Sequence, residues 1–129
     1  MSFQMNFDDV YEPTSLKEGE YQLRILDAKI KSSQKTGGDY LNVRLEVIGE
    51  PTAKDINHVM MFPTSADDVK RANNRKVAIL SFLKAFGLNT SGSIEPDEYV
   101  GSTGWAILTE EADPEYGMQN RVRKFVQPK

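Results

Sequence analysis

The chain has 129 residues, a formal net charge of −3 and no cysteine. This length favours one domain with one hydrophobic core, because two domains would each be too small to bury enough surface. The lack of cysteine excludes disulfides, thiolate zinc sites and a cysteine nucleophile. The net negative charge argues against a protein that coats nucleic acid through bulk positive charge.

The first twenty residues are acidic and have no apolar core, so they do not resemble a secretory signal. No run in the sequence approaches the ~20 apolar residues that a membrane span needs. We therefore expect a soluble cytoplasmic protein with no membrane partner. Residues 1–18 mix aromatic and acidic side chains without a helix or strand period, which predicts a flexible N-terminal arm before a domain over residues 19–129.

Residues 19–48 are predicted to form a long β-hairpin. The second strand alternates between apolar and polar side chains, which predicts one buried and one wet face. Its predicted buried residues are Leu41, Val43, Leu45 and Val47. In the first strand the apolar phase shifts by one residue after Ile25, which predicts a β-bulge that bends the strand, as a small closed barrel requires. The polar connection over 32–39 is predicted to project as a mobile loop.

A short apolar strand is predicted over 56–62, ending before Pro63. We expect its side chains to alternate, with Val59 and Met61 facing the core and His58, Met60 and Phe62 facing outward.

A helix is predicted to follow, capped by Thr64 or Ser65 and ended by Gly87. Its apolar stripe is expected to face the sheet and contains Val69, Ala72, Lys76, Val77, Leu80, Leu83 and Phe86. Two more strands are predicted over 104–109 and 120–126, separated by a long loop over 110–119. Phe62 and Trp105 could each stack bases or close an end of the barrel, and the core position is favoured for Trp105.

These elements predict a mainly β fold: a five-stranded OB-fold barrel with one α-helix between strands 3 and 4. The main alternative is a small α+β sheet with one helix lying across it. In an OB-fold, the sheet face and the loops after strands one and four hold single strands.

The chain also resembles a family of small phage and prophage proteins found with recombination genes. The resemblance is carried by four segments, GEYQLRILDAKIKSSQKTGGDYLNVRLEVI, RKVAILSFLKAFGL, EYVGSTGWAIL and EYGMQNRVRKFV. That family resembles phage single-stranded DNA-binding proteins of OB fold. The likeness runs from about residue 19 to residue 126 and contains no catalytic signature.

The resemblance implies a non-catalytic protein that binds single-stranded DNA with little sequence preference. Such a protein would serve phage DNA replication or recombination in a bacterial host, with other phage recombination or replication proteins as possible partners. Many single-stranded DNA-binding proteins end in an acidic tail that recruits partners. This chain instead ends in VRKFVQPK, a basic segment.

Single-strand binding needs flat rings on which bases stack and cations that follow the phosphates. The predicted wet faces of the strands, together with the tip of the first loop, provide both. The candidate nucleic-acid-binding residues are Arg24, Lys29, Lys31, Lys35, Tyr40, Arg44, His58, Phe62, Arg121 and Arg123. The alternative is that these polar side chains only solvate the outer face of the sheet and bind no ligand.

Catalysis has little support in the sequence, and we expect no cofactor and no metal. There is no GxxxxGK[ST], GxSxG or HExxH motif, and His58 is the only histidine. The alternative function is a protein-interaction module, such as a recombinase accessory factor or an inhibitor of a host enzyme. The net negative charge, the acidic segment over 95–115 and the aromatic-acidic arm favour it. A homodimer is also expected, because a small barrel often leaves a strand edge exposed.

Overall fold

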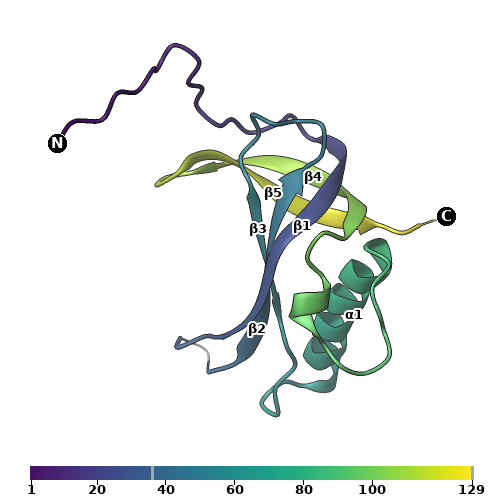
Figure 1. Ribbon diagram of the computed structural model, residues 1–129. Helices are drawn as coiled ribbons and strands as arrows, with labels where there is room; N and C mark the ends of the chain where they lie inside the picture. The colour runs from purple at the N-terminus through teal and green to yellow at the C-terminus, as the bar shows by residue number, and fades with distance from the viewer. Residues whose placement is uncertain (36, 129) are drawn as a thin grey trace.

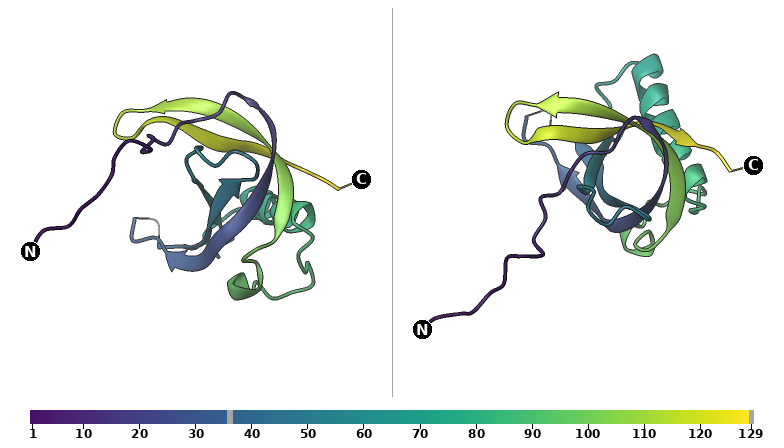
Figure 2. Two further views of the ribbon diagram at one scale, coloured as in Figure 1. Left: turned by 45° about the horizontal axis from the view of Figure 1, so that its top comes forward. Right: turned by 90° about the horizontal axis from the view of Figure 1, so that it is seen from above.

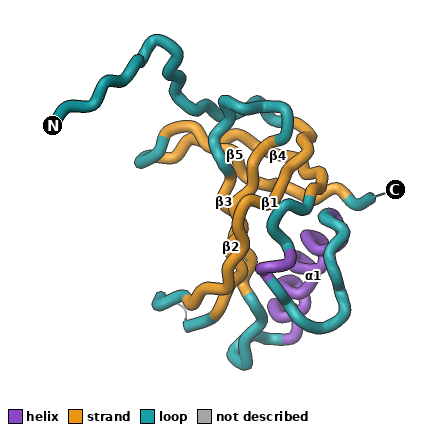
Figure 3. The backbone as a smooth tube through the Cα atoms, in the orientation of Figure 1, coloured by secondary structure: helices purple, strands orange, loops and turns teal. Residues whose placement is uncertain are grey.

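The computed structural model describes residues 1–35 and 37–128 and is mainly β (Figure 1). Its elements are β1 (Gly19–Ser32), β2 (Asp39–Val47), β3 (Ile56–Met61), α1 (Val69–Ala85), a 3₁₀ turn (Pro96–Glu98), β4 (Thr103–Asp113) and β5 (Gly117–Val126). The predicted arrangement of five strands with one α-helix between the third and fourth is confirmed. Figure 3 shows the strands forming the body of the molecule, with α1 on one side.

The five strands pair antiparallel in one sheet, in the order β3-β2-β1-β4-β5. The sheet curls strongly, so its two edge strands approach each other (Figure 2). In the described ranges, β3 and β5 form no ladder, and the rings of His58 and Phe125 meet there at 5.2 Å. The closed barrel expected from the sequence is therefore wrong, because the edges meet through side chains and the sheet stays open.

The predicted bulge in β1 is confirmed, since its register with β2 shifts between Ile25 and Asp27. Leu23 and Ile25 before the shift and Ala28 after it are all buried, so the bulge keeps one face of the strand toward the core. The predicted buried face of β2 is also confirmed. Thr36, in the middle of the predicted loop after β1, lies outside the described residues.

The predicted faces of β3 are inverted. Met60 pairs with Leu41 and is 3% exposed, whereas Val59 pairs with Asn42 and is 50% exposed. The two polar residues of β3, Asn57 and His58, are adjacent, so its alternation does not identify a face. Pairing with the strictly alternating β2 decides the orientation instead, because directly opposite residues lie on the same face of a sheet.

The helix begins later than the sequence predicted. Asp68 caps it, and its carboxylate accepts a hydrogen bond from the backbone N–H of Arg71 at 2.7 Å. The predicted cap Thr64 instead belongs to a turn, in which its N–H donates to Asp67 at 2.9 Å and the Asp67 carboxylate also accepts from Arg75. The predicted C-terminal stop is confirmed, since Gly87 follows the helix with φ of 66°.

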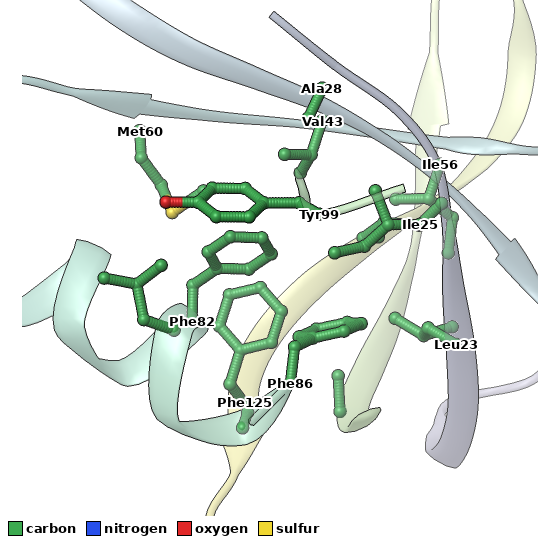
Figure 4. Packing of buried hydrophobic residues seen from close by; sticks show 14 of the residues in the cluster. Leu23, Ile25, Ala28, Val43, Ile56, Met60, Phe82, Phe86, Tyr99 and Phe125 are labelled. Carbon is green, nitrogen blue, oxygen red and sulfur yellow. The ribbon is translucent and has the colours of Figure 1, made fainter. Parts of the chain in front are cut away.

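Only the C-terminal half of α1 packs against the sheet. Its buried residues are Ile79, Phe82, Leu83 and Ala85, with Phe86 directly after them. Figure 4 shows Phe82 and Phe86 beside Phe125 of β5, and the ring centroids of Phe82 and Phe125 lie 5.5 Å apart. Aromatic pairs of this kind stabilise a fold by about 0.5–1.5 kcal/mol beyond burial. The predicted apolar stripe is therefore correct only in its last part, because Val69, Val77 and Leu80 are exposed.

The hairpin of β4 and β5 is longer than predicted, and the long loop over 110–119 does not exist. The strands continue to Asp113 and from Gly117, leaving a short turn between them. The Asp113 carboxylate accepts the N–H groups of Glu115 and Tyr116 at 2.8 and 3.0 Å, and these bonds lower its pKa. The sequence failed here because both faces of the hairpin tip are wet, so the strands show no alternation.

Candidate nucleic-acid interface

The register of β1 and β2 brings most of the predicted binding residues onto one surface. Lys29 lies opposite Asn42, and Lys31 lies opposite Tyr40. Arg24 lies opposite Glu46, and Arg44 opposite Asp27. Opposite residues share a face, and the inner face of β2 is buried, so all of these side chains lie on the outside. We call this surface the β1–β2 outer face and define it by Arg24, Lys29, Lys31, Tyr40 and Arg44.

Three cations of the β1–β2 outer face have carboxylate partners. Arg24 lies 2.8 Å from Glu46, Lys29 lies 3.7 Å from Asp27, and Arg44 lies 3.9 Å from Asp55. All three pairs are open to solvent, and exposed pairs of this kind are worth only about 0–1 kcal/mol. A phosphate can therefore replace the carboxylates at low cost.

Lys31 and Lys35 differ from the other cations, because neither has a carboxylate partner within residues 1–35 and 37–128. Both side chains are exposed. Lys35 lies in the turn after β1, whose ends are joined by a bond from the N–H of Ser33 to the carbonyl of Gly38 at 2.8 Å. Among the predicted binding residues, these two lysines are the cations most available to a phosphate.

The turns of the two long hairpins project on the same side of the molecule. Figures 1 and 2 show the β1–β2 turn and the β4–β5 tip extending away from α1 in every view. Tyr116, in the β4–β5 tip, is 66% exposed. In the sequence, the tyrosine before Gly117 is typical of a turn. The long loop predicted over 110–119 hid the fact that this turn joins two paired strands.

Arg121 and Arg123 lie on β5, apart from the β1–β2 outer face. Arg121 is 3.8 Å from both Glu111 and Asp113, at the side of the β4–β5 tip. Arg123 lies 3.2 Å from Glu18, where the N-terminal segment joins the sheet. Because β1 and β4 both separate β5 from β2 in the sheet order, these arginines do not extend the surface around Tyr40.

His58 and Phe62 do not face outward as predicted. His58 pairs with Val43 on the buried face, and its ring packs edge-on against Phe125. Burial lowers the pKa of His58 below its ordinary value of 6.5, so the ring is neutral at physiological pH. Phe62 is partly buried and packs against the core. The cause is the same inverted assignment of β3.

The inversion puts two other apolar residues on the outside, which the sequence analysis missed. Val59 lies opposite Asn42, and Met61 lies opposite Tyr40. Trp105 is also outside, 46% exposed and opposite Gln22, so the core position favoured for it is wrong. The flanking Gly104 and Ala106 are buried, and this alternation in β4 was the available signal.

Across the described part of the chain, no group of three or more acidic or histidine side chains could hold a metal ion. None of the described helices is long and apolar enough to cross a membrane.

Comparison with known families adds one result. A family model described as a protein of unknown function, DUF669, matches residues 3–102. The chain belongs to the DUF669 family. The DUF669 match covers the N-terminal segment, β1 to β3 and α1, and therefore includes the whole β1–β2 outer face. It ends before β4, so Arg121 and Arg123 lie beyond it. No curated protein matches the chain.

Proposed function

We propose that this DUF669 protein is a non-catalytic single-stranded DNA-binding protein with little sequence preference. The observation that carries the proposal is the register of β1 and β2, in which Tyr40 lies directly opposite Lys31 and shares its face with Lys29 and Arg44. An aromatic ring surrounded by cations is what a single strand requires, because bases stack on the ring while the cations follow the phosphates.

Low sequence preference follows from the chemistry of this surface. Stacking accepts any base, since every base has a π-face, and the phosphates are the same at every position. Asn42, between Tyr40 and Arg44, is the one amide among them and provides a single hydrogen-bonding group for a base edge. Duplex DNA offers no exposed base faces, so Tyr40 has nothing to stack on when the bases are paired.

The fold itself supports a finer proposal, that the curled sheet is a partly open OB barrel. Three observations favour it: a bulged first strand that pairs on both sides, a helix between the third and fourth strands, and edge strands that approach each other. The loops that bind single strands in such barrels correspond to the β1–β2 turn and the β4–β5 tip. The resemblance to phage proteins found with recombination genes further supports a function in phage replication or recombination, in the cytoplasm of a bacterial host.

Binding to labelled oligonucleotides tests the function directly. Fluorescence anisotropy should show that a single strand binds more tightly than a duplex of the same length. The logarithm of the affinity should fall linearly with the logarithm of the salt concentration, because phosphate contacts release counterions. Equal binding to both forms, or binding to neither, would contradict the proposal.

The second candidate is a protein-interaction module, and one observation favours it. Arg24, Lys29 and Arg44 already have carboxylate partners, so the β1–β2 outer face carries less free charge than its four cations suggest. Affinity purification from infected cells after nuclease treatment separates the two functions. A stoichiometric protein partner that survives the nuclease would favour this candidate, and loss of every partner would count against it.

A further inference from the structure

A groove between α1 and β5 has apolar walls that nothing in the described chain covers. Val77 is 51% and Leu80 is 38% exposed on α1, although the sequence predicted both to pack on the sheet. Together with Val122 and Phe125 of β5 they line a groove of about 550 Å³, which we call the α1–β5 groove. Its volume lies within the range of about 300–1,000 Å³ that is usual for binding sites.

The α1–β5 groove is positively charged. Lys84, Arg123 and Lys124 line it, and no aspartate or glutamate does. Arg123 has Glu18 at 3.2 Å, but no ion pair within residues 1–35 and 37–128 uses Lys84 or Lys124. An apolar groove with two uncompensated lysines fits an extended segment that carries both apolar and acidic side chains.

The N-terminal segment of the same chain has this composition. From here on, the name arm is restricted to residues 1–13, which precede the bridge between Thr14 and Ala53. These residues include three acidic residues and no lysine or arginine. Six of its large apolar side chains are more than half exposed, namely Met1, Phe3, Met5, Phe7, Val10 and Tyr11. The arm and the α1–β5 groove are therefore complementary in both charge and hydrophobicity.

The position of the arm indicates which groove it fits. The chain is fixed just after the arm, where Thr14 bridges to Ala53 and the backbone of Leu16 bonds to the side chain of Asn120. Figures 1 and 2 show the arm leaving this point and running away from α1 in every view. It thus runs away from the groove of its own chain.

We propose that the arm of one copy binds in the α1–β5 groove of a second copy, and that the exchange is reciprocal. Phe3, Phe7 and Tyr11 fill the apolar part of the groove, while Asp8 and Asp9 pair with Lys84 and Lys124. Reciprocal exchange closes the assembly at two subunits, because each copy contributes one arm and one groove. The proposal concerns assembly and is independent of whether the β1–β2 outer face binds DNA.

Sedimentation equilibrium of the full chain should give twice the monomer mass of 14.5 kDa. Deletion of residues 2–12 should give the monomer mass with unchanged circular dichroism. The sharper test uses two double variants, D8K/D9K in the arm and K84E/K124E in the groove. Each should be monomeric alone, and an equimolar mixture should form a heterodimer, because both of its contacts then join opposite charges. The matched control is K76E, an exposed position of α1 outside the groove, which should dimerise like the wild type.

Three results would overturn the proposal. One is a wild-type chain that is monomeric at every concentration up to the millimolar range. Another is a dimer that survives both the deletion and the charge reversals. The third is a deletion that leaves the number of subunits unchanged but tightens single-strand binding. This result would assign the arm to the DNA-binding face of its own chain.

Discussion

Tyr40 is the side chain whose removal tests the stacking contribution. Base stacking on an aromatic residue is worth about 1–3 kcal/mol per base. Tyr40→Ala should therefore weaken single-strand binding by roughly ten-fold or more, while the dependence on salt stays the same. The matched control is Tyr40→Phe, which keeps the ring and should keep the affinity. An equal loss in both variants would show that the hydroxyl, and not stacking, is responsible.

Lys31 tests the phosphate contribution, which has a different signature. Each phosphate contact to a single strand adds about 0.7 to the slope of log affinity against log salt. Lys31→Ala should lower the slope by that amount, because this lysine has no carboxylate to release first. Arg44→Ala should lower it by less, since Asp55 already lies 3.9 Å from the guanidinium.

The control for both substitutions is Lys76→Ala, since Lys76 is exposed on α1, away from the β1–β2 outer face and outside the α1–β5 groove. It should leave affinity and slope unchanged. If Lys31→Ala and Lys76→Ala give the same slope as the wild type, the phosphates do not pass over β1.

His58 should make stability depend on pH near neutrality. Burial lowers its pKa in the folded chain, so below its ordinary value of 6.5 the unfolded chain binds a proton that the folded chain does not. Stability is therefore complete above pH 6.5 and falls as the pH drops from 6.5 toward the folded pKa. His58 lines both the α1–β5 groove and a pocket between α1 and β3. The α1–β5 groove is lined by no carboxylate, and the pocket is lined by one, that of Asp68.

Urea unfolding midpoints at pH 7.5 and 5.5 measure this effect. His58→Phe keeps a ring against Phe125 but does not titrate, so its midpoint should change less between the two pH values than that of the wild type. The same change in both proteins would assign the pH dependence to other groups.

At the level of single residues, the sequence predicted what strict alternation can encode. Lys29, Lys31, Tyr40 and Arg44 were identified as one wet face because β2 alternates without interruption, and the register confirms that they share this face. His58 was misassigned because apolar and polar residues do not alternate in β3. Its orientation is set by pairing with β2, which is a property of the sheet and not of the strand.

At the level of elements, the bulge of β1 and the stop at Gly87 were predictable because each has a local cause in the sequence. The burial of α1 was predicted only in part, since the predicted stripe contained the exposed Val77 and Leu80 and omitted the buried Phe82. The observed contact depends on how far the helix extends over the curled sheet. Phe82 is fully buried, whereas Val77 lies at the edge of the α1–β5 groove.

Gly104 of β4 lies close to the end of α1. A Cβ atom at this position would lie 2.7 Å from the carbonyl oxygen of Ala85 and 3.0 Å from the ring of Phe86. Gly104→Ala should destabilise the fold by about 1–3 kcal/mol, as overpacking of a core does. Urea denaturation measures the loss. In the control Gly19→Ala, the nearest atom is the Tyr21 ring at 3.5 Å, an ordinary contact, so a small change is expected. Equal effects would contradict the packing argument.

At the level of the whole molecule, the fold separates two surfaces, and the net charge of the chain does not reveal how charge is distributed between them. The hairpin tips and the arm lie on one side, and α1 lies on the other (Figure 2). Helix α1 carries five basic residues and no acidic one. Seven of the 19 acidic residues lie over residues 95–115, which contain no lysine or arginine. A surface for single strands and a surface for a second copy can therefore coexist without competing.

The two ends of the chain are joined through one buried amide, that of Asn120. Its side-chain oxygen accepts the N–H of Leu16 at 2.8 Å, and its nitrogen donates to the carbonyls of Leu16 and Thr109 at 2.8 and 3.1 Å. Asn120→Ala removes all three bonds at a position only 4% exposed, and leaves partly buried backbone groups of Leu16 without these partners. Leaving such groups unsatisfied costs about 1–3 kcal/mol.

Asn120→Ala should therefore lower the urea midpoint and also release the base of the arm from the sheet. Tryptic cleavage after Lys17, under conditions where the wild type stays folded, should become faster because the backbone at Leu16 is no longer held. The neighbouring Gln119→Ala is the control, since its side chain only donates to the exposed carbonyl of Tyr116. Equal cleavage rates in the two variants would show that other contacts, such as the Thr14 bridge to Ala53 and the Arg123–Glu18 pair, hold this segment without Asn120.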